Sequence, residues 1–266
     1  MDIYIADAFT NKRYKGNPAA VCILEEELSS DSMQNIANEM NLSETAFLLR
    51  QGKQYILRWF TPETEVDLCG HATLASAHIL WDQQLFTGEE IRFSTKSGIL
   101  TANKVHDWIQ MNFPLENEHE CVPPNELIDG LGVSYTYIGK NRLDYLVEVE
   151  DEETVRTLQP NYRLWKSVES RGIIVTSRSS RSDIDFVSRC FYPAIGVDED
   201  PVTGSAHCCL GPYWQRKLNK SELIAEQLSK REGLLKLKVL EDRVIILGQA
   251  VTTLRGKLIT NNSSLE

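Results

Sequence analysis

The sequence predicts an α+β protein made of two similar halves, each a curved, mostly antiparallel sheet around one central helix. Three observations predict this fold class. Short segments that alternate apolar and polar residues, typical of strands with one buried face, recur along the chain. Each half contains one strongly apolar helical segment, which is the natural cover for the concave face of a sheet. Residues 58–67 and 189–198 form an internal repeat, because they share Arg, Phe, Pro, Val and Asp at the same five offsets, 131 residues apart.

The repeat continues beyond these two segments. Gly70 and Gly204 each open an apolar helix after a copy of the repeat, and KSGIL at 96–100 resembles REGLL at 231–235. In this alignment the extra residues of the second copy fall just before Gly204. A period near 131 residues is too long for a solenoid, so it indicates two domains of the same fold.

The first half is predicted to form strands with two helices between them. A helix is expected over 31–40, because apolar residues recur there at helical spacing after the N-capping residues Ser29 and Ser30. A hairpin turns around Gly52. The expected strands are residues 1–9, 18–24, 45–50, 55–60, 91–96, 99–104 and 107–113.

An acidic, proline-containing segment over 113–126 is the best candidate for a linker. We therefore expect an N-terminal domain of residues 1–116 with about 253–266, and a C-terminal domain of residues 117–252. The last residues, 261–266, are expected to be frayed. The expected strands of the second half are residues 135–139, 144–149, 172–177, 183–192, 234–240 and 243–248.

Composition and charge exclude several classes of protein. Hydrophobic residues make up 42% of the 266 residues and charged residues 25%, which is ordinary for a globular chain. No apolar run is long enough for a spanning helix, and the N-terminus lacks the pattern of a signal peptide. The net charge is −10, and Lys and Arg form no basic cluster. We expect a cytoplasmic protein without nucleic-acid or membrane partners.

The six cysteines are expected to be reduced thiols, because the chain shows no sign of export. A zinc site built from cysteines and histidines would need a familiar ligand spacing, and the spacing here matches none. We therefore expect no bound metal. The residues considered for it are Cys69, His71, His207, Cys208 and Cys209.

The two helix starts at Gly70 and Gly204 are the first candidates for a binding site. The N-terminus of a helix offers unpaired N–H groups and partial positive charge, which favour a carboxylate or phosphate. Two such termini would suit a small anionic substrate in a groove between the domains. The alternative is that both glycines only form tight turns before helices.

Side chains with acid–base or hydrogen-bonding capacity surround both helix starts. Cys69 and His71 flank the first glycine, and a thiol at a helix N-terminus has its thiolate favoured. Asp200, Thr203 and Ser205 surround the second. The alternatives are a small buried cysteine and ordinary N-capping by the acid and the hydroxyls.

Glu44 is a candidate general acid–base group, because it opens an apolar strand in which its carboxylate is partly removed from water. It has no carboxylate counterpart in the repeat, since the residue 131 positions later is Val175. The alternative is a solvated residue at the start of a strand.

Four segments resemble the PhzF-like family, named for a phenazine-biosynthesis isomerase. They are GNPAAV at 16–21, NLSETAFL at 41–48, RWFTPETEVDLCGHATLASAHIL at 58–80 and VDEDPVTGSAH at 197–207. The family shares its fold with diaminopimelate epimerase and proline racemase. The resemblance implies two pseudo-symmetric domains, each a curved sheet or barrel around a central helix, with the active site between them.

The resemblance also implies proton transfer at carbon without a cofactor, and a homodimer. Its catalytic residues fall on Glu44, His71, Asp200 and Ser205. We further expect Cys69, Gly70, Thr203, Gly204 and Asn17 to bind the substrate.

One departure bears on the reaction. The related epimerases use two opposed cysteines, one before each central helix; Cys69 occupies the first position, whereas the second falls on Pro201. We therefore expect an isomerase in which Glu44 moves a carbon-bound proton within a small carboxylate-bearing substrate. The alternatives are an epimerase or racemase that uses Cys69 with a second base other than a thiol, and a non-catalytic member that binds a metabolite or protein.

Overall fold

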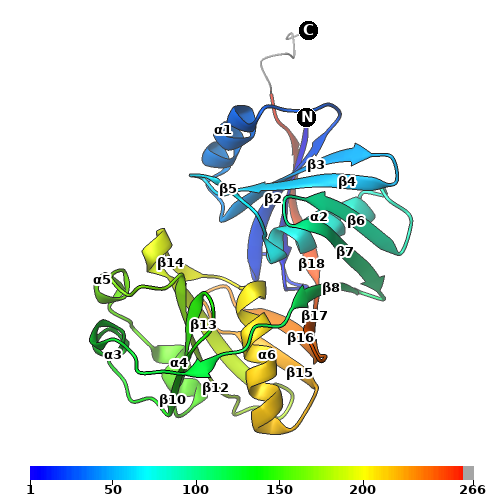
Figure 1. Cartoon of the computed structure of the whole chain (residues 1–266). Helices are drawn as coiled ribbons and strands as arrows, with labels where there is room; N and C mark the ends of the chain where they lie inside the picture. The colour runs from blue at the N-terminus through cyan, green and yellow to red at the C-terminus, as the bar shows by residue number, and fades with distance from the viewer. Residues whose placement is uncertain (260–266) are drawn as a thin grey trace. The chain divides into compact units, whose positions relative to one another are not determined.

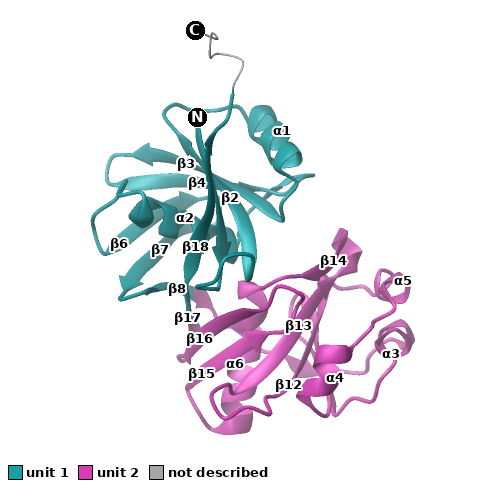
Figure 2. Ribbon diagram, turned by 180° about the vertical axis from the view of Figure 1, so that it is seen from behind, with its two compact units in different colours: residues 1–112, 247–266 teal, residues 113–246 magenta. Residues whose placement is uncertain are grey.

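The computed structural model describes residues 1–259 and divides into two compact units (Figure 1). Unit 1 is residues 1–112 together with the segment from Leu247 onward, and unit 2 is residues 113–246 (Figure 2). The domain boundaries thus fall at 112/113 and 246/247, where the sequence suggested 116/117 and 252/253. The C-terminal residues expected to fray lie outside the described part of the chain.

Unit 1 is built on one curved sheet. Its strands are β1 (Asp2–Ala8), β2 (Asn17–Leu24), β3 (Glu44–Gln51), β4 (Gln54–Phe60), β5 (Glu65–Val66), β6 (Glu90–Thr95), β7 (Gly98–Val105), β8 (Trp108–Pro114) and β18 (Ala250–Lys257). The strands pair in the order β18, β1, β2, β3, β4, β6, β7, β8, with β5 added to β4. The pairs β2–β3 and β4–β6 are parallel and the others antiparallel, so each parallel pair needs a crossover helix.

The first crossover is α1 (Ser30–Met40), as the sequence predicted. The side chain of Ser29 caps it by accepting from the Ser32 N–H, and Asn41 ends it in the left-handed conformation. Its apolar side packs on one face of the sheet, against residues that include Phe47 and Phe60.

The second crossover, α2 (Gly70–Asp82), is the central helix of unit 1. Nine of its thirteen residues are buried, and it contacts β1, β2, β3, β7 and β18. A helix that is apolar on all sides is stable only when it is surrounded. The curved sheet provides that surrounding, as Figure 1 shows.

Unit 2 repeats this plan with additional helices. Its strands are β9 (His119–Glu120), β10 (Tyr137–Lys140), β11 (Asp144–Glu148), β12 (Gly172–Arg178), β13 (Phe186–Tyr192), β14 (Val197–Asp200), β15 (Glu222–Gln227), β16 (Gly233–Val239) and β17 (Arg243–Gly248). Its helices are α3 (Asn125–Leu131), α4 (Glu152–Thr157), α5 (Tyr162–Trp165), the 3-10 turn η1 (Pro193–Ile195) and the central helix α6 (Gly204–Leu218). The sequence analysis found α6 but missed the short helices α3, α4 and α5.

The two sheets share one pairing scheme, which confirms the internal repeat. The order β9, β10, β11, β12, β13, β15, β16 follows the same sequence of antiparallel and parallel pairs as β18, β1, β2, β3, β4, β6, β7. In both units a short strand and then the central helix follow the fifth strand of this order. None of the helices in the described residues is long and apolar enough to span a membrane.

The ion pair that accompanies the repeated arginine also recurs. Arg58 on β4 forms a two-point contact with Glu65 on β5, at 2.7 and 2.8 Å, and its guanidinium lies 5.1 Å from the centre of the Phe60 ring. Arg189 on β13 forms the same two-point contact with Glu199 on β14, at 2.7 and 2.9 Å. The glutamates therefore match each other, although the sequence alignment did not pair them.

This pairing corrects where the extra residues of the second copy lie. Trp59 pairs with Val66, and the matching residue Cys190 pairs with Asp200 rather than with Val197. The extra residues consequently lie in the loop before the short strand, which forms η1 in unit 2, and not just before Gly204.

This register also sets which residues match near the two central helices. The residue of unit 2 that matches Cys69 in the repeat is Thr203, because each is the N-cap of the central helix of its unit. The residue that matches Glu44 is Gly172, not Val175, because each stands first in its strand and directly precedes the partner of a repeated phenylalanine.

Candidate active site

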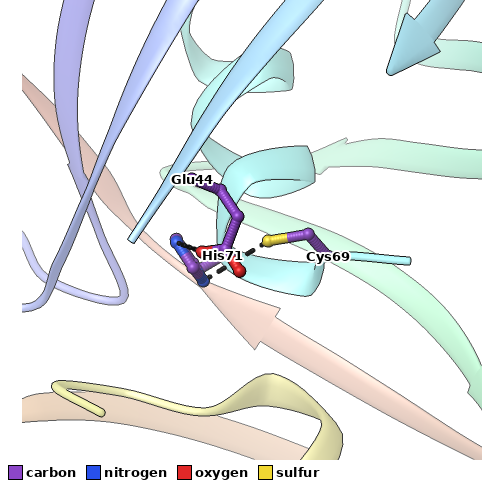
Figure 3. Close-up of side chains that lie close together, drawn as sticks. All are labelled: Glu44, Cys69 and His71. Atoms are coloured by element: carbon purple, nitrogen blue, oxygen red, sulfur yellow. Dashed lines mark hydrogen bonds and ion pairs between the residues drawn. The ribbon is translucent and has the colours of Figure 1, made fainter. Parts of the chain in front are cut away.

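Three of the predicted site residues, Glu44, Cys69 and His71, meet in unit 1 (Figure 3). The Nε2 of His71 is 3.1 Å from Oε2 of Glu44, and its Nδ1 is 3.6 Å from Sγ of Cys69. The imidazole thus contacts a carboxylate through one nitrogen and a thiol through the other.

The sheet positions Glu44. It is the first residue of β3 and pairs in parallel register with Ala19 of β2. Residues that pair across neighbouring strands point to the same face of a sheet. Phe47, three residues after Glu44 in β3, points to the opposite face from Glu44, and Phe47 packs on the α1 face. Glu44 therefore points to the α2 face. Asn17 lies on that face too, two residues before Ala19, and is fully buried.

The start of α2 positions the other two residues. Cys69 is the N-cap in an extended conformation (φ −145°, ψ 110°), and its side chain does not cap the helix. The hydroxyl of Thr73 donates to the Cys69 carbonyl at 2.5 Å and so holds this residue from inside the helix. Cys69 and His71 are each 6% exposed, whereas the Glu44 side chain is 19% exposed. The carboxylate is thus the most accessible group of the three.

Burial and the neighbouring groups perturb both partners of the imidazole–thiol contact. Burial lowers the pKa of the His71 imidazole, but Cys69 and the Glu44 carboxylate outweigh it and hold this pKa well above its ordinary value of 6.5. Burial, with the nearby charge of Glu44, raises the pKa of the Cys69 thiol. The charged form of the His71 imidazole is therefore favoured.

The same three residues have the donor types that a metal ion would use. One donor atom from each lies within 4.8 Å of the others, and carboxylate, imidazole and thiolate all bind Zn²⁺. The thiol and the carboxylate, however, contact opposite nitrogens of the ring, whereas a metal ion binds one nitrogen. A chelate would therefore require these side chains to rearrange.

The predicted residues of unit 2 surround the start of α6. The Thr203 hydroxyl donates to the Asp200 carboxylate, and the Thr203 N–H donates to Oε1 of Gln227 at 2.9 Å. Gly204 is the first residue of α6 and is buried, while Ser205 is exposed. Thr203 and Asp200 are thus brought together, and Ser205 occupies the place in α6 that His71 occupies in α2.

Unit 2 has no carboxylate at the position of Glu44. That position is Gly172, where a Cβ atom would lie 2.2 Å from the Tyr192 ring. Beside it, Arg171 forms a two-point ion pair with Asp144, a residue that is 1% exposed. The sequence analysis missed this cluster, because only the strand register shows which residue of unit 2 matches Glu44.

Comparisons with known proteins agree with this architecture. Residues 6–256 match the family model described as "Phenazine biosynthesis-like protein". A Halalkalibacterium halodurans protein named as an uncharacterized isomerase is 60% identical over 97% of this chain and 98% of its own length.

Solved structures show the same fold. The crystal structure of a PhzF-family phenazine biosynthesis protein from Enterococcus faecalis matches with a TM-score of 0.94 and 42% identity, over 97% of this chain and 99% of that one. A probable proline racemase from Agrobacterium radiobacter matches with a TM-score of 0.66 at 8% identity, over 98% and 93% of the two chains, which shows that the fold extends to racemases. The chain therefore belongs to the phenazine biosynthesis-like PhzC-PhzF family, with the fold of the diaminopimelate epimerase and proline racemase group, and is an isomerase.

Proposed function

We propose that this isomerase moves a carbon-bound proton within a small carboxylate-bearing substrate, without a cofactor, and that Glu44 carries the proton. The observation that carries the proposal is the contact between Glu44 and the buried His71, 3.1 Å apart. The imidazolium at this distance forms an ion pair with Oε2 and leaves Oε1 for the substrate.

The reaction then needs two steps. Oε1 of Glu44 takes a proton from an sp3 carbon next to a conjugated system, and the electron pair of the C–H bond enters that system. The Glu44 carboxyl next returns the same proton to a different carbon of the system, and the electron pair forms the new C–H bond. One carboxylate suffices for both steps, which agrees with a glycine, Gly172, at the matching position of unit 2.

The start of α2 supports binding of the substrate carboxylate. The Cys69 side chain does not cap this helix, so its first N–H groups are not used by the N-cap residue. Such groups and the helix dipole favour an anion, and Gly70 allows close approach of the backbone. Asn17 on the same face of the sheet adds an amide to this set.

Four residues of unit 2 are included in the proposal, Asp200 and Ser205 because of the family resemblance and Thr203 and Gly204 because they stand at the start of α6. Asp200 and Ser205 are proposed as catalytic hydrogen-bonding groups, and Thr203 and Gly204 as substrate contacts. Separate alanine substitutions of Asp200 and Ser205 test them, and each is expected to lower turnover with the far-UV circular dichroism unchanged.

Glu44→Gln tests the proposal directly, because glutamine keeps the size of the side chain but cannot accept the proton. Small cyclic and amino carboxylates are incubated in deuterated water with the protein, and deuterium uptake is followed by mass spectrometry. We expect the substitution to lower the rate of proton transfer by about a hundred- to ten-thousandfold or more. Glu39→Gln, an exposed residue of α1, is the matched control. Full activity of Glu44→Gln would refute the role of Glu44.

The rival reaction, epimerisation by the Cys69 thiol, makes a different prediction. It requires inversion at a stereocentre and a fall of about a thousandfold or more in turnover for Cys69→Ser. The glutamate shuttle expects that variant to stay active. The Thr203 hydroxyl at the position that matches Cys69 favours the shuttle, because a hydroxyl is a poor base.

A further inference from the structure

The Cys69 side chain does not make the hydrogen bond that is usual for a residue at the N-cap. N-cap side chains commonly accept a hydrogen bond from the first turn of their own helix, as Ser29 does for α1. Cys69 makes no such bond; its sulfur lies 3.6 Å from Nδ1 of His71, within the range of a hydrogen bond to sulfur.

The matching residue of unit 2 behaves in the same way. Thr203 does not cap α6, although threonine is a good N-cap residue, and its hydroxyl binds the Asp200 carboxylate instead. In both copies the N-cap side chain of the central helix therefore contacts an ionisable group. This recurrence argues that Cys69 is more than a small residue that fills space.

We propose that Cys69 is a positioning residue for His71: its sulfur accepts a hydrogen bond from Nδ1–H and thereby keeps Nε2 at ion-pair distance, 3.1 Å, from Oε2 of Glu44. The inference rests on the proposed function only for its catalytic consequence, since the contact itself exists without substrate.

The number of N–H donors on a protonated imidazole explains why His71 needs the Cys69 sulfur as a partner. A protonated imidazole has two N–H donors, and His71 is too buried for water to serve both. Glu44 from β3 forms an ion pair with the ring at Nε2, and Cys69 is the hydrogen-bond partner at Nδ1. These two are the titratable groups that act on His71 within unit 1, and their combined effect on its pKa is upward. Without the sulfur, one buried donor has no partner and the protonated form is disfavoured.

The test is a titration of the His71 ring nitrogens by ¹⁵N NMR, on the full chain without substrate. The His71 signals are identified by their loss in His71→Gln. In the wild type we expect His71 to remain protonated well above pH 6.5. In Cys69→Ala the midpoint should fall by about one pH unit or more. In Cys69→Ser, where the hydroxyl oxygen accepts the hydrogen bond, the midpoint should recover at least half of that fall.

Cys22→Ala is the matched control, because Cys22 is a buried free thiol of unit 1 on the face of β2 that packs against α1. It should titrate like the wild type. An unchanged midpoint in Cys69→Ala, or an equal fall in Cys22→Ala, would overturn the inference. If Cys69→Ala does not fold, a Cys69→Ser midpoint equal to that of Cys69→Val would overturn it.

The catalytic consequence is measured separately. If Glu44 is the proton carrier, the alkaline limb of the pH profile for deuterium exchange should move down with the His71 midpoint in Cys69→Ala. A shifted NMR midpoint with an unshifted pH profile would refute the role of this pair in the reaction and leave the positioning role intact. An unshifted midpoint refutes the positioning role, whatever the activity.

Discussion

The fourth residue of each central helix shows how single side chains hold the site. Thr73 in α2 donates its hydroxyl to the Cys69 carbonyl, and His207 in α6 donates Nδ1–H to the Thr203 carbonyl at 2.8 Å. Both polar residues are buried in their unit. Each fixes the backbone of the N-cap residue whose side chain contacts an ionisable group. Their polarity in an otherwise apolar core is explained by this bond to the carbonyl.

His207 should make the protein sensitive to acid. Burial lowers its pKa to about 4, whereas a histidine in the unfolded chain titrates near 6.5. Between these pH values the unfolded chain binds one more proton than the folded chain, so stability falls as the pH falls. At about 1.4 kcal/mol per pH unit, this costs about 3 kcal/mol between pH 6.5 and pH 4. Urea unfolding at pH 7 and pH 4.5 should show a smaller loss for His207→Gln than for the wild type, and equal losses would contradict the assignment.

At the scale of elements, the matched strands β4 and β13 each carry an arginine at the same position, but the two arginines make different contacts. Arg58 binds Glu65, which is also bound by Lys96 at 2.6 Å. Arg189 binds Glu199 and, in addition, donates to carbonyls at the end of α4, including that of Leu158 at 2.7 Å. Carbonyls at a helix end have no partner within the helix. Arg189 therefore stabilises the connection through α4, between β11 and β12, as well as the short strand β14.

Replacing each arginine with methionine should separate these roles. Arg189 is 7% exposed, and its loss leaves a carboxylate and buried carbonyls without a donor, at a cost of about 3–5 kcal/mol in the free energy of unfolding. For Arg58→Met we expect a loss of about 1 kcal/mol, because Arg58 is partly exposed and Lys96 still pairs with Glu65. Urea unfolding of both variants measures the difference; equal losses would show that the α4 carbonyls contribute nothing.

At the scale of the whole molecule, the two units differ in how the chain builds them. Unit 1 needs two separate segments, because β18 pairs with β1. Unit 2 is one continuous segment, residues 113–246, with its own buried core around Trp165 and Phe191. A continuous segment with a complete core meets the usual conditions for folding alone.

We therefore expect residues 113–246, expressed alone, to fold. The fragment should show a cooperative thermal transition by circular dichroism and dispersed amide signals in NMR. A broad, non-cooperative transition would show that this unit depends on the rest of the chain. The Glu44–His71–Cys69 cluster should be absent from the fragment, since all three residues belong to unit 1.

Much of the molecule could be predicted from the sequence. Alternating apolar residues located most strands, and the glycines before two apolar segments located both central helices. The repeat predicted two units of one fold, which the strand pairing confirms. The short helices α3 and α5, of seven and four residues, were missed because a helix with so few turns shows no recognisable apolar period. The candidate residues Glu44, Cys69 and His71 were all named from the sequence.

Only the tertiary structure decided how those residues relate to one another. Strand register depends on hydrogen bonds between segments far apart in the chain, so a local match such as Val66 with Val197 could mislead the alignment. The register shows that Gly172 matches Glu44 and that Thr203 matches Cys69. The position of His71 between a carboxylate and a thiol likewise follows from packing α2 against β3. Residue types are local information and determined the chemistry available to this protein, whereas contacts formed across the fold determined which of these groups lie together.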